Sequence, residues 1–512
     1  MTENKRQFKA IKGTRDILPP DSALWNWFEQ TARDTFESYN FREIRLPIFE
    51  ETDLFARSVG TDTDIVSKEM YTFEDRTTEI EWPFDLLSLM KFIEDIERGM
   101  NSGETPSTFD NQEFLRKITS YIAEEERLMS QPVDEALKDA WSAHSKHYWR
   151  FLHLARTLQL GQWISLRPEA TASVVRAYVE HGMQTQPGNS KLYYVGPMFR
   201  RERPQKGRYR QFYQIGAEVL GQSDAPAIDA EVIEMLMTFF KRAGLTRTTL
   251  YINSIGDKNC RPQYVEKLRE ELRKVADQLG PDSQRRIETN PLRVLDSKLP
   301  DEQAIIAKLP RISDHLCNAC REHFAKLKEE LNLRGIAYEE NWRLVRGLDY
   351  YTRTTFEVIA EGLGSQNAVC GGGRYDGLVE LLGGPPTKGI GFAIGTDRAI
   401  LSLQESGKLP QLPALAVFVA WMGQAAYPTA VNIARKLREA GLAVELPPEE
   451  MKFKKSLGLA DKLGARYALI IGEDEVNSGT FTLKRLDDSD QKKLSEFDLL
   501  EYLESEQRGT RA

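Results

Sequence analysis

The residues best suited to chemistry form an arginine-rich run near the middle of the chain. Residues 199–211 read FRRERPQKGRYRQ, with six basic residues and one acid, Glu202. Arginine side chains bind phosphate through paired, planar hydrogen bonds, and a dense cluster of them repels itself unless an anion is present. A solvated strand–loop–strand is the alternative, but the interleaved aromatic residues disfavour it. We therefore expect this run to bind a phosphate-bearing ligand.

Four other segments could contribute to the same site. Residues 166–171, LRPEAT, hold a glutamate that could bind an ammonium group, or could cap a helix and pair with the neighbouring arginine. Residues 344–356, LVRGLDYYTRTTF, suit either a pocket wall or a β-hairpin with core tyrosines. Residues 370–378, CGGGRYDGL, and 389–400, GIGFAIGTDRAI, hold glycines that let the backbone approach a ligand closely. The last segment lacks the spacing of a dinucleotide-binding loop.

These segments need a framework of strands and helices. Trp25–Tyr39 has apolar residues at helical spacing. Phe41–Phe49 is typical of a strand, and Pro47 within it indicates a sheet edge or an interface. Residues 341–404 alternate strand-like runs with glycine-rich turns, whereas residues 257–340 are mostly helical and charged. The pattern predicts a sheet covered by helices.

The segment 77–160 differs from the rest of the chain. Its prolines separate three helix-length stretches, and it holds 15 acidic and 9 basic residues. It therefore carries −6 of the net charge of −8 and leaves −2 for the rest of the chain. Because nucleic acids respond to local charge, the overall acidity does not exclude them as partners. We expect a helical subdomain that projects from the main body and braces a dimer, binds a partner or is simply tolerated.

The last part of the chain has the pattern of a small α/β domain. Residues 405–413, ESGKLPQLP, have the composition of a linker. Strands are predicted at Ala414–Ala420, Leu442–Leu446 and Tyr467–Ile471, with helices such as Tyr427–Ala440 between them. This alternation predicts a separate domain after the linker.

Composition sets broad limits on the class of protein. The chain has 512 residues, of which 41% are hydrophobic, and four cysteines, too few for a disulfide framework. Its N-terminus has no apolar run of the kind found in signal peptides. No stretch approaches the roughly 18 apolar residues needed to span a bilayer. We expect a cytoplasmic protein without a membrane partner.

Taken in order, these segments resemble the motifs of one enzyme family. Residues 196–212, GPMFRRERPQKGRYRQF, resemble motif 2 of class II aminoacyl-tRNA synthetases, and GIGFAIGTDRAI resembles motif 3. Residues 43–55, EIRLPIFEETDLF, resemble motif 1 at the dimer interface of that class. LVRGLDYYTRTTFE and CGGGRYDGL resemble the two signatures particular to histidyl-tRNA synthetases, and LRPEAT resembles their amino-acid loop. Outside 77–160, the resemblance covers nearly the whole chain.

The resemblance implies an α+β fold, with an antiparallel class II sheet, flanking helices, helical insertions and a C-terminal α/β anticodon-binding domain. It implies this division: a catalytic domain at 1–76, 161–256 and 336–404, an extra helical insertion at 77–160, a helical insertion domain at 257–335, a linker at 405–413 and the anticodon-binding domain at 414–512. In the family, the strands on either side of 77–160 are joined by a short turn. They should therefore be hairpin partners, and the insertion should leave and return at nearly the same point.

The resemblance also implies a ligase that acts in two steps. The carboxylate of histidine attacks the α-phosphate of ATP, which gives histidyl-adenylate and pyrophosphate. The 3′-hydroxyl of the last adenosine of the histidine tRNA then takes the histidyl group. No protein nucleophile is needed, so catalysis rests on positioning and charge stabilisation. ATP would enter with Mg²⁺ on its phosphate oxygens, and motif 1 would join two copies of the chain as a homodimer.

By similarity, an ATP site is expected among the arginines. Arg200 would contact the α-phosphate and Glu202 the adenine amino group. Arg208 and Arg398 would hold the outer phosphates. Arg346 takes the place of the catalytic arginine of the family, which neutralises the α-phosphate as it becomes five-coordinate.

The positions that match the histidine site of the family are Glu169, Ala170, Thr171, Gln214, Glu218, Tyr350, Tyr351 and Tyr375. The glutamate and threonine of LRPEAT, with Gln214, would bind the amino group of histidine. Glu218 would lie with Tyr351 and Tyr375 around the imidazole, where a carboxylate that needs an N–H donor rejects apolar isosteres. Ala170 stands where glycine is more usual in the family.

The tRNA is expected to contact the motif 2 loop. By similarity, Arg203 and Gln205 would reach its acceptor end. A second basic stretch runs from Lys452 to Arg466, and its first residues, KFKKS at 452–456, resemble a class I synthetase signature, but the chain has no other class I element. We therefore predict that it begins a basic helix that faces the tRNA.

The cysteines at 317 and 320 allow two interpretations. Cys317 and Cys320, with His323 next, have a zinc-like spacing and could take a ligand such as Cys260 from 57 residues away. Because the segment has the pattern of a continuous helix, we favour ordinary reduced cysteines and predict no metal site. His144, His147 and His153 are taken as packing or surface residues.

The alternative function is a non-catalytic, synthetase-like regulatory subunit of histidine biosynthesis. Such paralogues generally lack the anticodon domain and the ATP-binding arginines, and this chain has both.

Overall fold

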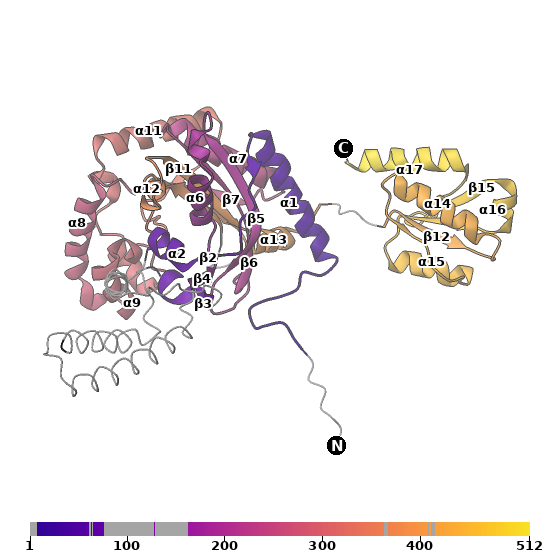
Figure 1. Ribbon diagram of the computed structural model, residues 1–512, viewed down its shortest axis with the longest axis horizontal. Helices are drawn as coiled ribbons and strands as arrows, with labels where there is room; N and C mark the ends of the chain where they lie inside the picture. Colours follow the sequence, from indigo (N-terminus) through magenta and orange to yellow (C-terminus); the bar gives the residue numbers. More distant parts are fainter. Residues whose placement is uncertain are drawn as a thin grey trace, which may run out of the picture. The chain divides into compact units, whose positions relative to one another are not determined.

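Two sheets form the centres of two units, Met1–Leu409 and Pro410–Ala512, in the computed structural model of the chain (Figure 1). The structure describes residues 8–60, 63, 65–75, 127, 162–362, 367–407, 409–410 and 415–511. The predicted insertion at 77–160, with its three histidines, lies outside the described residues, Arg127 apart. The boundary between the two units falls inside the range predicted to be a linker.

An eight-stranded sheet carries the N-terminal unit, in the order β1-β5-β6-β11-β10-β9-β7-β8. Its six central strands are antiparallel neighbours: β5 (Ser190–Phe199), β6 (Gln211–Gly221), β11 (Lys388–Gly395), β10 (Ala368–Arg374), β9 (Thr352–Ala360) and β7 (Thr248–Ser254). The short edge strands β1 (Arg42–Glu43) and β8 (Glu339–Glu340) pair in parallel. The mainly antiparallel sheet confirms the predicted α+β class.

The two faces of this sheet have different cover, as the alternation along β5 indicates. Tyr193 points to one face, where its ring packs against Phe36 of α1 (Asp21–Ser38) at 5.7 Å. On that face α1 packs against α7 (Pro226–Arg242), which also contacts α11 (Asn318–Leu333). Tyr194 points to the other face and packs with α6 (Thr171–Glu180) and α12 (Leu378–Leu381).

A second, three-stranded sheet in the same unit joins the two sides of the insertion. It consists of β2 (Phe49–Glu51), β4 (Gln162–Leu166) and β3 (Tyr71–Asp75), with β4 in the middle and α2 (Thr52–Val59) following β2. β3 and β4 are antiparallel partners, and Asp75 lies opposite Gln162. The prediction that the strands flanking 77–160 form a hairpin pair is confirmed.

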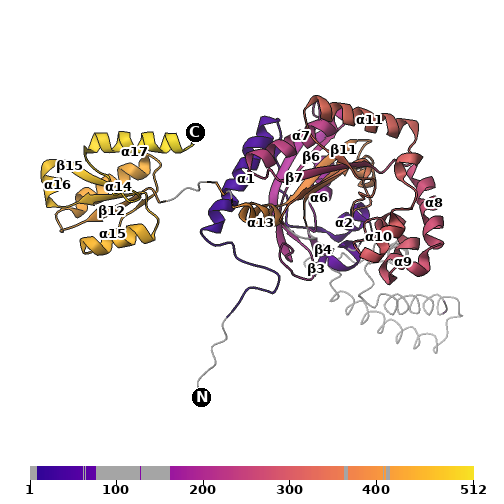
Figure 2. The same cartoon turned by 180° about the vertical axis from the view of Figure 1, so that it is seen from behind.

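Helices that follow β7 form a separate core of their own. α8 (Arg261–Arg273), α9 (Pro281–Thr289) and α10 (Pro300–Ile306) lie with α11 along one side of the unit (Figure 2). The prediction of a continuous helix around the paired cysteines is wrong. A short 3₁₀ turn ends at His315 and α11 begins at Asn318, so Cys317 is the residue before its first turn.

The C-terminal unit is an α/β domain, as predicted. Its sheet has the order β13-β12-β14-β15-β16, and its first three strands are parallel. The elements are β12 (Val417–Trp421), α14 (Tyr427–Glu439), β13 (Val444–Glu445), α15 (Phe453–Lys462), β14 (Tyr467–Ile471), α16 (Glu473–Ser478), β15 (Thr480–Arg485), β16 (Gln491–Ser495) and α17 (Glu496–Arg511). The antiparallel pair β15 and β16 was not predicted from the sequence.

In the described part of the chain, we found no helix both long and apolar enough to cross a membrane.

Candidate active site

One cavity of about 240 Å³ brings together most of the residues singled out in the sequence. Its lining includes Glu169, Thr171, Arg200, Glu202, Arg208, Gln214, Arg346, Tyr350, Tyr351 and Arg398. They come from segments far apart in the chain, which the sheet and the helix α13 (Thr396–Ser406) hold side by side.

The hairpin between β5 and β6 supplies the first arginines. The backbones of Gln205 and Arg208 exchange two hydrogen bonds of 3.1 and 2.9 Å, and Gly207 makes the tight turn with a φ of +75°. The turn brings Arg208 back to the cavity, where its Nη1 lies 3.2 Å from a carboxylate oxygen of Glu202. Arg200 is fixed by a 3.0 Å hydrogen bond from its Nε to the carbonyl of Pro168.

Arg398, in the first turn of α13, approaches the same hairpin from the other side. Its Nε donates to the carbonyl of Gly207 at 3.1 Å, and its Nη1 donates to the carbonyl of Ala368 at 3.0 Å. Burial lowers the pKa of Arg398, and repulsion from the charge of Arg208 lowers it further. A bound anion would relieve this repulsion, which is the arrangement expected of a phosphate site.

Arg346 lies flat against the backbone of β10. Its Nη1 donates to Glu357 at 2.9 Å, and its Nε is buried without a hydrogen-bond partner. A methyl group on Gly371 would overlap its guanidinium, so the glycine is needed for this close approach. Arg346 is therefore held on one side by Glu357 and keeps donors for a ligand on the other.

A buried carboxylate, Glu218, lies just behind the cavity wall. Thr171 and Tyr375 each donate a hydroxyl hydrogen bond of 2.7 Å to one of its two oxygens. Only 1% of Glu218 is exposed, and burial raises its pKa to about 8. Gly391 leaves the space that its carboxylate occupies, because a methyl group there would overlap it.

Tyrosines form an aromatic wall next to this carboxylate. The rings of Tyr350 and Tyr351 lie 4.7 Å apart, and Tyr375 meets Tyr350 edge to face at 5.8 Å. Arg374, the buried residue directly before Tyr375, pairs with Asp229 and Asp376, and these ion pairs anchor the chain at this point. Such a wall suits a planar ring.

Glu169 proves to be a helix cap, as one of the two readings of LRPEAT predicted. Its oxygens accept hydrogen bonds from the backbone N–H groups of Thr171 and Ala172 at 2.7 and 3.0 Å. The predicted ion pair with Arg167 is absent, because that guanidinium donates to carbonyls of Leu46, Pro47 and Pro197. Glu169 still lines the cavity, and a carboxylate with one donor on each oxygen can accept another.

Five predicted residues do not line the cavity. Ala170, Glu218 and Tyr375 are buried behind it. Arg203 and Gln205 are exposed on the hairpin turn and are not among the lining residues. These two positions are accessible to a macromolecular partner.

Sequence reasoning missed three residues around the cavity. Tyr194 lines it with a buried hydroxyl that has no hydrogen-bond partner. Glu357 is the partner of Arg346, and its place as the one charged residue among residues 354–360 of β9 was the signal that could have revealed it. Asp397 accepts a hydrogen bond from the backbone of Tyr213 at 2.9 Å and pairs with Arg15 of the N-terminal segment.

Comparison with known proteins agrees with this geometry. A family model described as histidyl-tRNA synthetase matches residues 135–399, and one described as an anticodon-binding domain matches residues 416–506. A protein of Koribacter versatilis named histidine–tRNA ligase is 46% identical over 97% of this chain and 96% of its own length. One of Solibacter usitatus with the same name is 46% identical, over 97% and 99%. The crystal structure of apo S. aureus histidyl-tRNA synthetase matches with a TM-score of 0.68 and 32% identity, over 97% of this chain and all of that one.

Proposed function

The chain belongs to the histidyl-tRNA synthetase family, and from this premise we propose how its cavity divides between ATP and histidine. Its activity is the ATP-dependent ligation of histidine to tRNA by a class II synthetase. A regulatory subunit has less support, because the relatives that align over nearly their whole length are named as ligases. The observation that carries the proposal is that one cavity is lined both by arginines, Arg200, Arg208, Arg346 and Arg398, and by Glu169, Thr171, Gln214 and the paired tyrosines Tyr350 and Tyr351.

The arginine part of the cavity is proposed to hold ATP. Arg200 would contact the α-phosphate, and Arg208 and Arg398 the outer phosphates, since their self-repulsion calls for an anion. The carboxylate of Glu202 would accept a hydrogen bond from the amino group of adenine. Magnesium would enter with ATP as part of the substrate, and Glu357 is a carboxylate in the cavity that could help to hold it.

The remaining part is proposed to hold histidine. Glu169, with Thr171 and Gln214, would bind its amino group, and Gln214 brings a buried Oε1 without a hydrogen-bond partner. The tyrosine wall of Tyr350 and Tyr351 would flank the imidazole. Glu218 accepts one hydroxyl on each oxygen, from Thr171 and Tyr375, and a carboxylate in that state has capacity for a ring N–H as a further donor.

The first chemical step follows from this arrangement. A carboxylate oxygen of histidine forms a bond to the α-phosphorus of ATP, and the bond to the bridging oxygen of the β-phosphate breaks, so pyrophosphate leaves. Arg346 would neutralise the extra negative charge on the five-coordinate phosphorus, and Glu357 would orient the guanidinium of Arg346. The arginine would supply charge at the point where charge develops, without moving.

The tRNA and a second copy of the chain are its proposed macromolecular partners. Arg203 and Gln205 would contact the acceptor end of the tRNA, and the exposed lysines at the start of α15 would face the tRNA near its anticodon. We propose a homodimer formed through the motif 1 region. Because tRNA charging serves protein synthesis, we propose that the enzyme acts in the cytoplasm.

Histidine-dependent exchange of pyrophosphate into ATP tests the central assignment. Arg346→Ala is expected to slow the exchange by about 100-fold or more, as the loss of one preorganised charge does elsewhere. Arg435→Ala, an exposed arginine paired with Glu439 on α14, is the control and should change the rate less than twofold. A rate for Arg346→Ala within about tenfold of wild type, equal to about 1.4 kcal/mol in the barrier, would contradict a catalytic role.

A further inference from the structure

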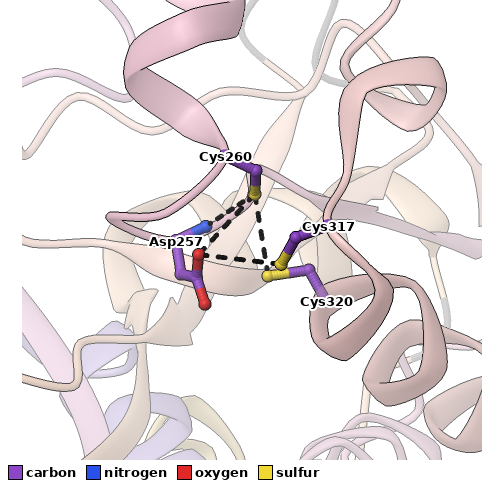
Figure 3. A group of neighbouring side chains, drawn as sticks. All are labelled: Asp257, Cys260, Cys317 and Cys320. Carbon is purple, nitrogen blue, oxygen red and sulfur yellow. Dashed lines mark hydrogen bonds between the residues drawn. The ribbon is translucent and has the colours of Figure 1, made fainter.

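Four potential metal ligands converge outside the active site, at the base of the helices that follow β7. Asp257 lies three residues after β7, and Cys260 comes just before α8. Cys317 precedes α11, and Cys320 lies in its first turn. One ligand atom from each of the four side chains lies within 4.8 Å of the others, and the side chains point toward a common centre (Figure 3).

The distances fit a tetrahedral ion better than a disulfide. The sulfurs of Cys260 and Cys320 are 3.8 Å apart. A disulfide requires about 2.05 Å, whereas zinc–sulfur bonds of about 2.3 Å in a tetrahedron set neighbouring sulfurs about 3.8 Å apart. Oδ1 of Asp257 lies 3.7 Å from the sulfur of Cys260 and 3.9 Å from that of Cys317. A tetrahedron with a zinc–oxygen bond of about 2.1 Å would set these at about 3.6 Å.

The surroundings orient Asp257 and engage His323 elsewhere. The backbone N–H of Asn259 donates to Oδ1 of Asp257 at 2.9 Å, and the guanidinium of Arg353 lies 3.5 Å from its other oxygen. His323, the neighbour singled out in the sequence, is engaged elsewhere: its Nε2 lies 3.0 Å from the carbonyl of Asp224. Three sulfurs and one carboxylate therefore complete a four-ligand set without the histidine.

We propose that Asp257, Cys260, Cys317 and Cys320 bind one zinc ion with tetrahedral geometry. Thiolate ligands select zinc over magnesium or calcium, and four protein ligands leave no open position for a substrate, so the site is structural. The cysteines favoured above as ordinary reduced thiols thus become ligands. Cys260 and Cys320 are buried, while Cys317 is partly exposed and provides a route by which the ion can enter.

The ion would join two parts of the chain that are far apart in sequence. It would tie the segment after β7 to the start of α11, across the 56 residues between Cys260 and Cys317 that contain α8, α9 and α10. Cys260 and Cys320 belong to the same buried cluster as Tyr351, and Arg261 donates to the carbonyl of Tyr351 at 2.6 Å. The ion would therefore close the helical region beside the wall of the active site.

Metal analysis of the full-length chain tests the proposal. Protein grown with added zinc and purified without chelators should contain about one zinc per chain by mass spectrometry. Cys320→Ser should lower this content at least about fivefold. Cys370→Ser is the matched control, because this fourth cysteine lies in β10 outside the cluster, and it should keep about one zinc.

A second measurement decides the question even if Cys320→Ser fails to fold. Cobalt exchanged into the wild-type chain should give the near-ultraviolet absorption of thiolate-bound Co²⁺ and the visible bands of a tetrahedral ion. Asp257→Cys should keep the ion and increase the near-ultraviolet absorption, because a fourth sulfur replaces the oxygen. A wild-type chain with less than about 0.2 zinc after reconstitution, or with another metal in its place, would overturn the proposal, as would full zinc in a folded Cys320→Ser variant.

Discussion

The carboxylate of Glu218 would favour binding of an imidazole, but its burial lowers the stability of the folded protein as the pH rises. Its carboxylate suits an imidazole N–H, but it is buried and its pKa rises from the ordinary 4.5 to about 8. Between these values the unfolded chain releases a proton that the folded protein keeps. The free energy of unfolding should therefore fall as the pH rises from about 4.5 to about 8, by about 1.4 kcal/mol per unit at most.

We predict that Glu218→Gln removes this pH dependence. The gain in stability of the variant over wild type should be near zero at pH 4.5 and should grow to a few kcal/mol by pH 8.5, while histidine binding weakens. Urea unfolding of the N-terminal unit, followed at several pH values, measures the difference in stability between the variant and the wild type. Glu270→Gln, an exposed acid on α8, serves as the control. A difference that stays constant with pH would show that Glu218 is ionised at no unusual cost.

At the same scale, the sequence pointed to most of the cavity residues, whereas it named Cys260, Cys317 and Cys320 only as a disfavoured zinc alternative and did not point to Asp257. The arginines and tyrosines stand in short motifs whose chemistry can be read locally. The pairing of Cys260 with Cys320 depends on how β7 and α11 meet in three dimensions, which spacing alone does not give. Tyr194 was missed for the same reason, because only the strand alternation decides which of two adjacent tyrosines faces the cavity.

Among the elements, the hairpin from β5 to β6 has two sides. Its turn directs Arg208 to the cavity and leaves Arg203 and Gln205 exposed. In the proposed division of the site, pyrophosphate exchange would use only the inner side, while transfer to tRNA would use both. The two steps should therefore be separable by mutation.

We predict that Arg203→Ala and Gln205→Ala leave pyrophosphate exchange within about twofold of wild type and lower kcat/KM for tRNA by about tenfold or more. For Arg203→Ala, the dependence of tRNA binding on salt should also weaken, because a phosphate contact is lost. Lys206→Ala is the control, since this side chain already pairs with Glu405 at 2.8 Å. Equal losses in both assays would assign the loop to ATP rather than to tRNA.

Strands and helices were largely predictable, and the exceptions have physical reasons. β12 and β14 are apolar runs with every residue buried, which is typical of central parallel strands. β16 escaped prediction because QKKLS is a polar strand at the sheet edge, where charged residues are common. The prediction of a strand over Phe41–Phe49 is wrong for most of that range: only Arg42–Glu43 of β1 and Phe49 of β2 are strand, and Pro47 lies in the loop between them.

On the scale of the whole molecule, an apolar face suggests where two copies meet. Phe49 lies opposite Leu166 and Phe73 opposite Ile164 in the three-stranded sheet, so the four side chains share one face. Phe49 is 51% exposed and Phe73 is 44% exposed. Exposed phenylalanines on adjoining strands of one face are typical of an interface, and β2 lies within motif 1.

We predict that the wild-type chain sediments with twice its mass of 58.5 kDa, and that the double variant Phe49→Glu and Phe73→Glu sediments as a monomer. A charge at the centre of such a face opposes association because it would be buried without a partner. Phe453→Glu, at an equally exposed phenylalanine of the C-terminal unit, should leave the mass unchanged. A dimer that survives the double variant would place the interface elsewhere.

The pairing of Asp75 with Gln162 has a practical consequence. A chain that leaves the sheet at one residue and re-enters at its partner spans only the width of a hairpin, whatever lies between. The cavity residues after β4 are then fixed by the register of β3 and β4 rather than by the length of the connecting segment. This junction is therefore a natural point at which to graft a foreign domain with closely spaced ends, such as a fluorescent reporter, into a working enzyme.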